Sequence, residues 1–117
     1  MGENQFSREL RLLTPSHFTY VFSDAIPAVS PQFTLLARIN SNDKPRLGIT
    51  ISKKRVRKAH DRNRLKRLIR ESFRHRAQQL PPIDIIVIGK SGADSLSNDE
   101  IFTALDKLWR KLVKRCN

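Results

Sequence analysis

The 117-residue chain has very little cysteine: a single residue, Cys116, next to the C-terminus. One cysteine excludes an intramolecular disulfide and a cysteine-based metal site, and it suits a reducing compartment. Long apolar runs are also missing. No stretch approaches the roughly 20 apolar residues of a membrane-spanning helix, and the N-terminus lacks the apolar core of a signal peptide. These absences predict a cytoplasmic protein with no membrane partner.

Acidic residues are scarce as well. The chain has 23 Lys and Arg against 11 Asp and Glu, which gives a formal net charge of +12. Twelve of the basic residues but only two acids lie within residues 53–76, so this segment alone carries a charge of +10. A basic segment of this density predicts a polyanionic partner. The carboxylates are scattered and form no pair that could hold catalytic metal ions, so we expect no catalytic residue and no protein-bound metal.

The length fits one domain over residues 1–117. Hydrophobic periodicity predicts an α/β (α+β sandwich) fold with the element order α-β-β-α-β-α, in which helices pack on a small mixed sheet. The segment 25–31 carries two prolines and is expected to be a loop. The two strands that follow are joined by a short turn, which predicts an antiparallel hairpin. The expected elements are helices at 15–24, within 60–80 and after Ser97, and strands at 32–40, 46–52 and 83–89.

The basic segment is predicted to be an amphipathic helix. Its apolar residues recur at helical intervals on one face, and Trp109 in the last helix is likewise expected to be core. The opposite face carries Asn63, Arg67, Arg70 and Arg74 at i, i+4, i+7 and i+11, flanked by Lys66 and Arg64, with Lys53 and Lys54 just before the helix. Arginine forks match phosphate oxygens, so this face predicts binding to a phosphate backbone. A merely solvated face would mix in acids, and only Glu71 appears there.

Three other functions compete with this interpretation. A stand-alone RNA-binding module, such as a ribosomal protein, has the same charge and size. A helix-turn-helix DNA binder fits poorly because a strand, not a helix, precedes the basic helix, so no DNA partner is expected. Gly89-Lys90-Ser91 looks like the end of a P-loop, but Asp84 stands where that motif needs glycine.

The stretch "TISKKRVRKAHDRNRLKRLIRESFR" resembles the signature of the bacterial ribonuclease P protein component, with the RNR motif at residues 62–64. The segments "RELRLLTPSHFTYVF", "PRLGITISKK" and "LDKLWRKL" fit the same family, and the resemblance covers about residues 6–115. It implies the protein subunit of an RNA-based endoribonuclease that removes the 5′ leader of precursor tRNA. It also implies a catalytic RNA partner that holds Mg²⁺, and an unusual left-handed βαβ crossover.

The resemblance further implies which residues bind RNA. Contacts to the catalytic RNA would come from Arg62, Asn63, Arg64, Lys66, Arg67 and Arg70, with Lys53, Lys54 and Arg74 beside them. A cleft between the sheet and the first helix would take the single-stranded leader, using Phe18, Phe22, Phe33 and Arg46. Base stacking on aromatic rings tolerates any sequence, which suits variable leaders. Phe18 and Phe22 could equally be ordinary core residues, and the sequence leaves both possibilities open.

Overall fold

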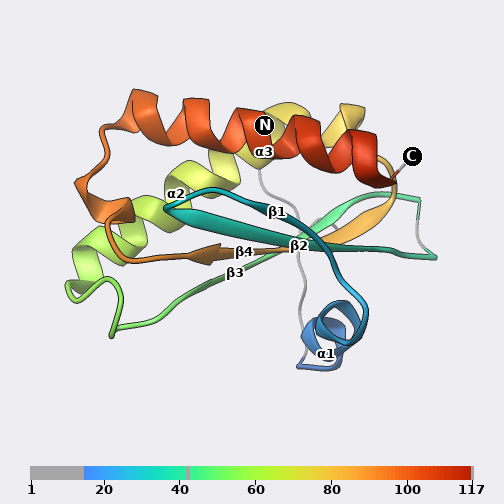
Figure 1. The fold of residues 1–117 in the computed structure, drawn as a ribbon, viewed down its shortest axis with the longest axis horizontal. Coiled ribbons are helices and arrows are strands. Elements are labelled where there is room, and N and C mark those ends of the chain that lie inside the picture. The colour runs from blue at the N-terminus through green and yellow to red at the C-terminus, as the bar shows by residue number, and fades with distance from the viewer. Residues whose placement is uncertain (1–14, 42, 117) are drawn as a thin grey trace, which may run out of the picture.

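The computed structural model describes residues 15–41 and 43–116. Two short 3₁₀ turns, Ala77–Gln79 and Ala93–Ser95, accompany the main elements. Figure 1 shows α2 and α3 side by side over one face of the sheet and α1 alone on the other face. Within the described residues, no helix is both long and apolar enough to cross a membrane. The elements are α1 (Pro15–Ser23), β1 (Ile26–Val29), β2 (Phe33–Ile39), β3 (Arg46–Ile51), α2 (Ala59–Arg76), β4 (Ile83–Gly89) and α3 (Asn98–Cys116).

The four strands form one mixed sheet in the order β1-β2-β4-β3. β2 runs antiparallel to both β1 and β4, whereas β3 runs parallel to β4. β4 lies inside the sheet because its β-branched run is buried on both faces, as the unbroken apolar sequence "IIVI" requires. The prediction of a small mixed sheet packed by helices is therefore confirmed.

The β3-α2-β4 unit is a left-handed crossover. α3 packs on β1 and α2 packs on β3, and α3 lies in front of α2 in Figure 1, so β3 lies behind β4 in that view. Both strands run from right to left with α2 above them. Seen from the helix side with the strands pointing up, β4 thus lies to the left of β3. Parallel crossovers are almost always right-handed, so this is the exception that the family resemblance implied.

The predicted antiparallel hairpin between the second and third strands is wrong. β2 and β3 do point in opposite directions, but β4 lies between them and pairs with both. The physical reason is that β4 is buried on both faces and needs a hydrogen-bonding partner along each edge. The connection from β2 to β3 passes over the end of β4, where the backbone N–H of Asn40 donates to the Pro82 carbonyl over 3.0 Å.

The expected loop at residues 25–31 is also wrong in part, because it contains strand β1. Proline is tolerated at a sheet edge, where its missing N–H faces away from the neighbouring strand. Pro27 occupies such a position, and its outward carbonyl accepts a hydrogen bond from Arg115 of α3. The order is therefore α-β-β-β-α-β-α, one strand more than the sequence predicted.

The main core lies between the sheet and the layer formed by α2 and α3. It contains the predicted apolar stripe of the basic helix, Leu65, Leu68, Ile69 and Phe73. Trp109 is fully buried there, as predicted; its indole Nε1 donates to Ser72 Oγ over 2.8 Å, and its ring lies edge-to-face against Phe73 with the ring centres 5.9 Å apart. The capping box at the start of α3 forms as the sequence indicated, with reciprocal bonds between Ser97 and Glu100.

A second, smaller apolar cluster lies under α1 on the opposite face of the sheet. Val21 and Ile86 are completely buried at its centre, with Phe18, Leu36 and Ile88 partly buried around them. Among the described residues, α1 is the one helix on this face and is only nine residues long, so Val29 and Thr50 on the same face remain exposed. This uncovered area is where a ligand could lie flat on the sheet.

Candidate nucleic-acid interface

The outer face of α2 presents an exposed ridge of polar and cationic side chains. Asn63, Arg67 and Arg70 are exposed, and no side chain in the described ranges forms a bond with any of them. Lys66 lies beside them and is half-buried. The buried stripe on the other side of the helix fixes the backbone, so these groups are held at defined positions on a rigid support. We call Asn63, Arg67 and Arg70 the α2 ridge.

Arg74 does not belong to that free ridge. Its Nη2 donates to Glu71 Oε1 over 2.5 Å, and its side chain is 21% exposed. Glu71 is the one acid on this part of the helix, and it lies three residues before Arg74, where side chains on a helix meet. The i+11 spacing therefore placed Arg74 on the correct side of the helix, but its charge is already neutralised within the protein.

The two arginines of the RNR motif hold neighbouring segments in place. Arg62 Nη1 donates to the carbonyl oxygens of Val56 and Arg57, each over 2.9 Å. Arg64 Nη2 donates to the Leu96 carbonyl over 2.7 Å and, with Nε, to Asn98 Oδ1. Arg62 thus ties the basic loop to the start of α2, and Arg64 ties α2 to the start of α3. Between them, Asn63 alone points freely outward.

The loop before α2 gathers more positive charge. Lys53 and Lys54 are exposed, and Val56 is fully buried as the loop's anchor. The N-cap residue of α2, Lys58, makes no side-chain capping bond, so the first turn keeps unsatisfied backbone N–H groups. The N-terminus of a helix carries a partial positive charge and binds phosphate well. Loop, helix start and ridge therefore form one continuous cationic region.

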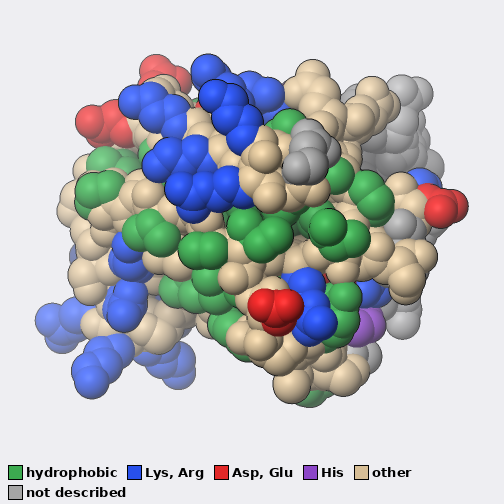
Figure 2. All heavy atoms as spheres, turned by 45° about the vertical axis from the view of Figure 1, so that its right-hand side comes forward, with side chains coloured by type: hydrophobic (Ala, Val, Ile, Leu, Met, Phe, Trp, Pro, Cys, Tyr) green, Lys and Arg blue, Asp and Glu red, His purple; other side chains and the backbone are tan. Residues whose placement is uncertain are grey.

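The opposite face of the sheet offers an accessible, mostly uncharged row. Val29, Thr34, Ile88 and Thr50 are register partners that follow one another across β1, β2, β4 and β3. Thr34 and Ile88 are half-buried, whereas Val29 and Thr50 at the two ends are exposed. We call these four residues the open row. In Figure 2, which keeps α3 above and α1 below as in Figure 1, hydrophobic side chains form a band between a gathering of Lys and Arg at the upper left and another at the lower left.

The two aromatic residues of α1 differ in their surroundings. Phe18 is partly buried against the cluster around Val21 and Ile86. Phe22 is 51% exposed, so it does not belong to the core, and its ring is accessible for stacking. The sequence had left core packing and ligand contact equally open for both residues, and the structure assigns packing mainly to Phe18.

The placement of Phe33 in a leader-binding cleft is wrong. Phe33 is 0% exposed and packs in the main core under α2 and α3, on the face of the sheet away from α1. Strand residues alternate between the two faces, so Thr34 faces α1 and Phe33 cannot. The aromatic type suggested a base contact, but the strand register decides the face.

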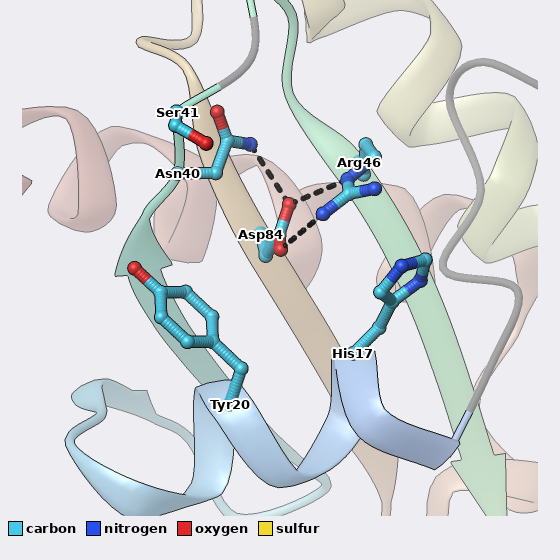
Figure 3. Close-up of a pocket in the computed structure, with 6 residues that line it drawn as sticks. All are labelled: His17, Tyr20, Asn40, Ser41, Arg46 and Asp84. Carbon is cyan, nitrogen blue, oxygen red and sulfur yellow. Dashed lines mark hydrogen bonds and ion pairs between the residues drawn. The ribbon is translucent and has the colours of Figure 1, made fainter.

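A pocket of about 200 Å³ lies at the other end of α1, lined by side chains from α1, the β2–β3 connection, β3 and β4 (Figure 3). At its base, Asp84 is 1% exposed and accepts bonds from Arg46 Nε and Nη2 over 2.9 and 2.8 Å and from Asn40 Nδ2 over 2.8 Å. Hydrogen bonding to Asp84 raises the pKa of Arg46 above its ordinary value. Arg46 therefore stays charged but is held in place by a buried carboxylate.

Sequence reasoning missed Asp84, Tyr20 and Arg38. Asp84 had a usable signal, since a carboxylate inside a strand of buried β-branched residues requires a partner. Tyr20 and Arg38 fasten α1 to β2: the Tyr20 hydroxyl donates to the Ile39 carbonyl over 2.7 Å, and Arg38 lies 4.0 Å from the Tyr20 ring centre. Arg38 Nη1 also donates to the Tyr20 carbonyl near the end of α1. Their pairing depends on the sheet register and could not be read from spacing.

The described residues contain no group of three or more His, Cys, Asp or Glu side chains that could hold a metal ion. Among the acids of residues 15–41 and 43–116, Asp84 alone is buried, and its carboxylate accepts hydrogen bonds from Arg46 and Asn40.

Comparison with known proteins shows what this chain is similar to. A family model described as "Ribonuclease P" matches residues 6–113. The ribonuclease P protein component of Pseudoalteromonas atlantica is 69% identical over 116 residues, covering 99% of this chain and 97% of that protein. The protein component of Cronobacter sakazakii is 56% identical over 106 residues, covering 91% and 89%.

Solved structures show the same fold. The ribonuclease P protein of Staphylococcus aureus superposes with a TM-score of 0.83 at 29% identity, covering 89% of this chain and 97% of that one. The ribonuclease P protein of Thermotoga maritima superposes with a TM-score of 0.71 at 31% identity, covering 90% and 96%. The two solved structures thus share the fold of this chain.

Proposed function

The chain belongs to the ribonuclease P protein family, and from that premise we propose how its two surfaces divide the work of the holoenzyme. As a subunit of ribonuclease P it associates with the RNA of that enzyme and serves tRNA processing. We propose that the α2 ridge and the basic loop bind the catalytic RNA, while the α1 side of the sheet binds the single-stranded 5′ leader of precursor tRNA. The expected place of action is the cytoplasm.

One observation carries this proposal. The described residues present unpaired cations on the outer face of α2, and an exposed aromatic ring and accessible uncharged side chains on the opposite side of the sheet. Cations arranged on a rigid helix suit the phosphates of a folded RNA. An exposed aromatic ring and an uncharged row of strand residues on the same side of the sheet suit unpaired bases, because every base can stack. The two faces can therefore be occupied by two RNAs at once.

The RNR motif contributes to the first surface in two ways. Arg62 and Arg64 use part of their N–H groups to hold the basic loop and the start of α3. An arginine has five N–H donors, so each can bind the protein and still offer donors to a phosphate. The motif thereby positions Asn63 and the first turn of α2 against the RNA. Lys53, Lys54 and Lys66 add charge around it, and Arg74 contributes least because Glu71 neutralises it.

On the leader side, the chain's own residues bind and orient. Phe22 offers its ring to a base, and the open row provides a flat floor on which a strand can lie. Arg46 is held by Asp84 at the pocket near the start of α1 and would direct its remaining donors toward the strand. When bound, Mg²⁺ is held by the RNA and supplies the cleavage chemistry. The protein raises affinity for the precursor, and so less Mg²⁺ is required to hold it.

The test compares Phe22, exposed on α1 at one side of the sheet, with Phe33 of β2, buried on the other side. Phe22→Ala should weaken binding of precursor tRNA to the holoenzyme by the value of one stacking contact, about 1–3 kcal/mol. Binding of mature tRNA, which has no leader, should not change. Phe33→Leu is the matched control: it should lower the melting temperature without any preference between precursor and mature tRNA. Equal weakening of both tRNAs by Phe22→Ala would contradict leader binding at this surface.

A further inference from the structure

A second group of cations lies on α3, outside the surfaces described so far. From residue 107 to residue 116 the helix carries five Lys and Arg and no acid. Two of the five have partners in the protein: Arg110 pairs with Asp106, and Arg115 donates to the Pro27 carbonyl. The other three, Lys107, Lys111 and Lys114, are exposed, and no described residue bonds to their side chains. We call these three the α3 stripe.

The spacing of the α3 stripe places its members on one face. Positions i, i+4 and i+7 lie above one another on a helix and span about 10 Å along its axis. The helix dipole favours cations in the last turn, which accounts for Lys114 but not for Lys107 or Lys111. A solvated helix face usually alternates charges in i,i+4 pairs. Three free lysines in a row, with no acid among them, instead form a surface for phosphates.

The α3 stripe borders the edge of the sheet where the open row ends. α3 packs on β1, and the bond from Arg115 to Pro27 joins the helix to that strand. The two elements run in opposite directions (Figure 1), so the helix positions before Arg115 extend alongside β1 toward Val29. Val29 is the first residue of the open row, because it pairs with Thr34 on the α1 side of the sheet.

The open row therefore has cations at both ends. Its β3 end, Thr50, is followed within four residues by Lys53 and Lys54. Its β1 end, Val29, lies on the edge strand against which α3 packs from the other face. Figure 2 shows the same arrangement, with one gathering of Lys and Arg over α3, another at the loop after β3, and hydrophobic side chains between them. An extended strand that crosses the sheet along this row would meet positive charge where it enters and where it leaves.

We propose that the α3 stripe binds the phosphates of the distal part of the 5′ leader, after the strand has crossed the open row and passed the edge of β1. This inference rests on the proposed function, since it needs a leader on the α1 side. Lysines on flexible stems suit this role, because a single strand beyond the cleft has no fixed geometry to match. The stripe would then act only on precursors whose leaders are long enough to reach it.

The test measures holoenzyme affinity for one precursor tRNA whose leader is shortened one nucleotide at a time. Wild type should gain affinity with leader length until the strand covers α3. The triple variant Lys107→Gln/Lys111→Gln/Lys114→Gln should stop gaining at a shorter leader and bind the shortest leaders as wild type does. The conservative triple Lys→Arg variant should restore the full gain. Circular dichroism of both variants checks that α3 is intact.

Salt dependence gives the size of the effect. Three lost phosphate contacts to a single strand reduce the slope of log K against log salt by about 2. Between about 50 and about 200 mM salt, wild type should therefore lose about 20-fold more affinity for the longest leader than the Gln variant does. Equal weakening at every leader length, mature tRNA included, would place the stripe on the catalytic RNA and overturn the proposal; so would no weakening at all.

The same series separates this inference from the proposed function. Phe22→Ala should reduce the affinity gained from short leaders as well as long ones. If Phe22→Ala shows leader selectivity and the Gln variant does not, the leader binds the α1 side but does not reach α3. If neither variant weakens binding of precursor more than binding of mature tRNA, the leader does not bind the α1 side of the sheet.

Discussion

At the scale of single residues, the buried Asp84 decides the chemistry of the pocket beneath α1. Its carboxylate accepts three bonds from two side chains that come from the β2–β3 connection and from β3. Asp84 thereby joins the two outer parts of the chain that lie on either side of β4. It also keeps the Arg46 guanidinium facing the pocket.

We predict that Asp84→Ala destabilises the protein by about 3 kcal/mol, because it leaves a partly buried arginine without its counter-ion. Asn40→Ala should lower the free energy of unfolding by only about 1 kcal/mol, since it removes one hydrogen bond and leaves no buried charge without a partner. Urea unfolding of the two variants measures the difference. Equal losses would show that the charge of Asp84 is not what holds this corner of the fold.

Residue-level prediction succeeded where periodicity alone decides the outcome. The ridge residues Arg67 and Arg70 and the core residue Trp109 follow from helical spacing, which is a local property. Phe33 was misplaced because its face depends on a strand register set by β4, more than 40 residues away in the chain. The pairing of Arg46 with Asp84 is equally non-local, and no spacing rule reaches it.

At the scale of elements, α2 was predictable because one helix carries both its own anchor and its own binding face. The pairing of β2 and β3 was not predictable, because a short turn between two strands permits pairing but does not require it. A third strand buried on both faces separated them. β1 was missed since prolines usually mark loops, and only an edge position accommodates them.

We predict that the double variant Arg67→Glu/Arg70→Glu weakens binding to the catalytic RNA and flattens its salt dependence. Each lost phosphate contact lowers the slope of log K against log salt by about 0.9 for a duplex backbone, so the change should be about 2. The control is the Lys→Gln variant of the α3 stripe, which should leave this RNA's binding unchanged in the absence of precursor. An unaltered slope in the double variant would remove the α2 ridge from the RNA interface.

A second prediction concerns the contact between α2 and α3. Asp106 accepts bonds from Arg110 and from Arg76, and these bonds hold its pKa below the ordinary value of 3.8. Because the pKa of Asp106 is lower in the folded state, its ionised carboxylate stabilises that state at pH values above the ordinary pKa. This stabilisation is lost as the pH falls through the lowered pKa. Asp106→Asn should therefore reduce the melting temperature near neutral pH, by an amount that shrinks below about pH 4.

Melting curves of wild type and Asp106→Asn across this pH range provide the measurement. Asp24→Asn, at an exposed position near the end of α1, controls for the general effect of removing one negative charge. A gap between wild type and Asp106→Asn that stays constant into strong acid would contradict a role for the ionised carboxylate in joining the two helices.

At the scale of the whole molecule, the sheet separates the two proposed RNA-binding surfaces. The α2 and α3 layer covers one face, and α1 covers only part of the other, so cations on the helices and the open row on the sheet remain separately accessible (Figure 1). Composition predicted the polyanion, and the family resemblance predicted which RNA. The division into two surfaces required the fold, since the strand order places β1 and its neighbour α3 at one end of the open row.

The central claim is that this subunit increases affinity for precursor tRNA by holding its leader. The most direct test is to measure the Kd of precursor and mature tRNA for the catalytic RNA at low Mg²⁺, with and without the protein. We predict that the protein strengthens binding of precursor much more than binding of mature tRNA, and that removing the leader abolishes this difference. Equal strengthening of both tRNAs would contradict the account.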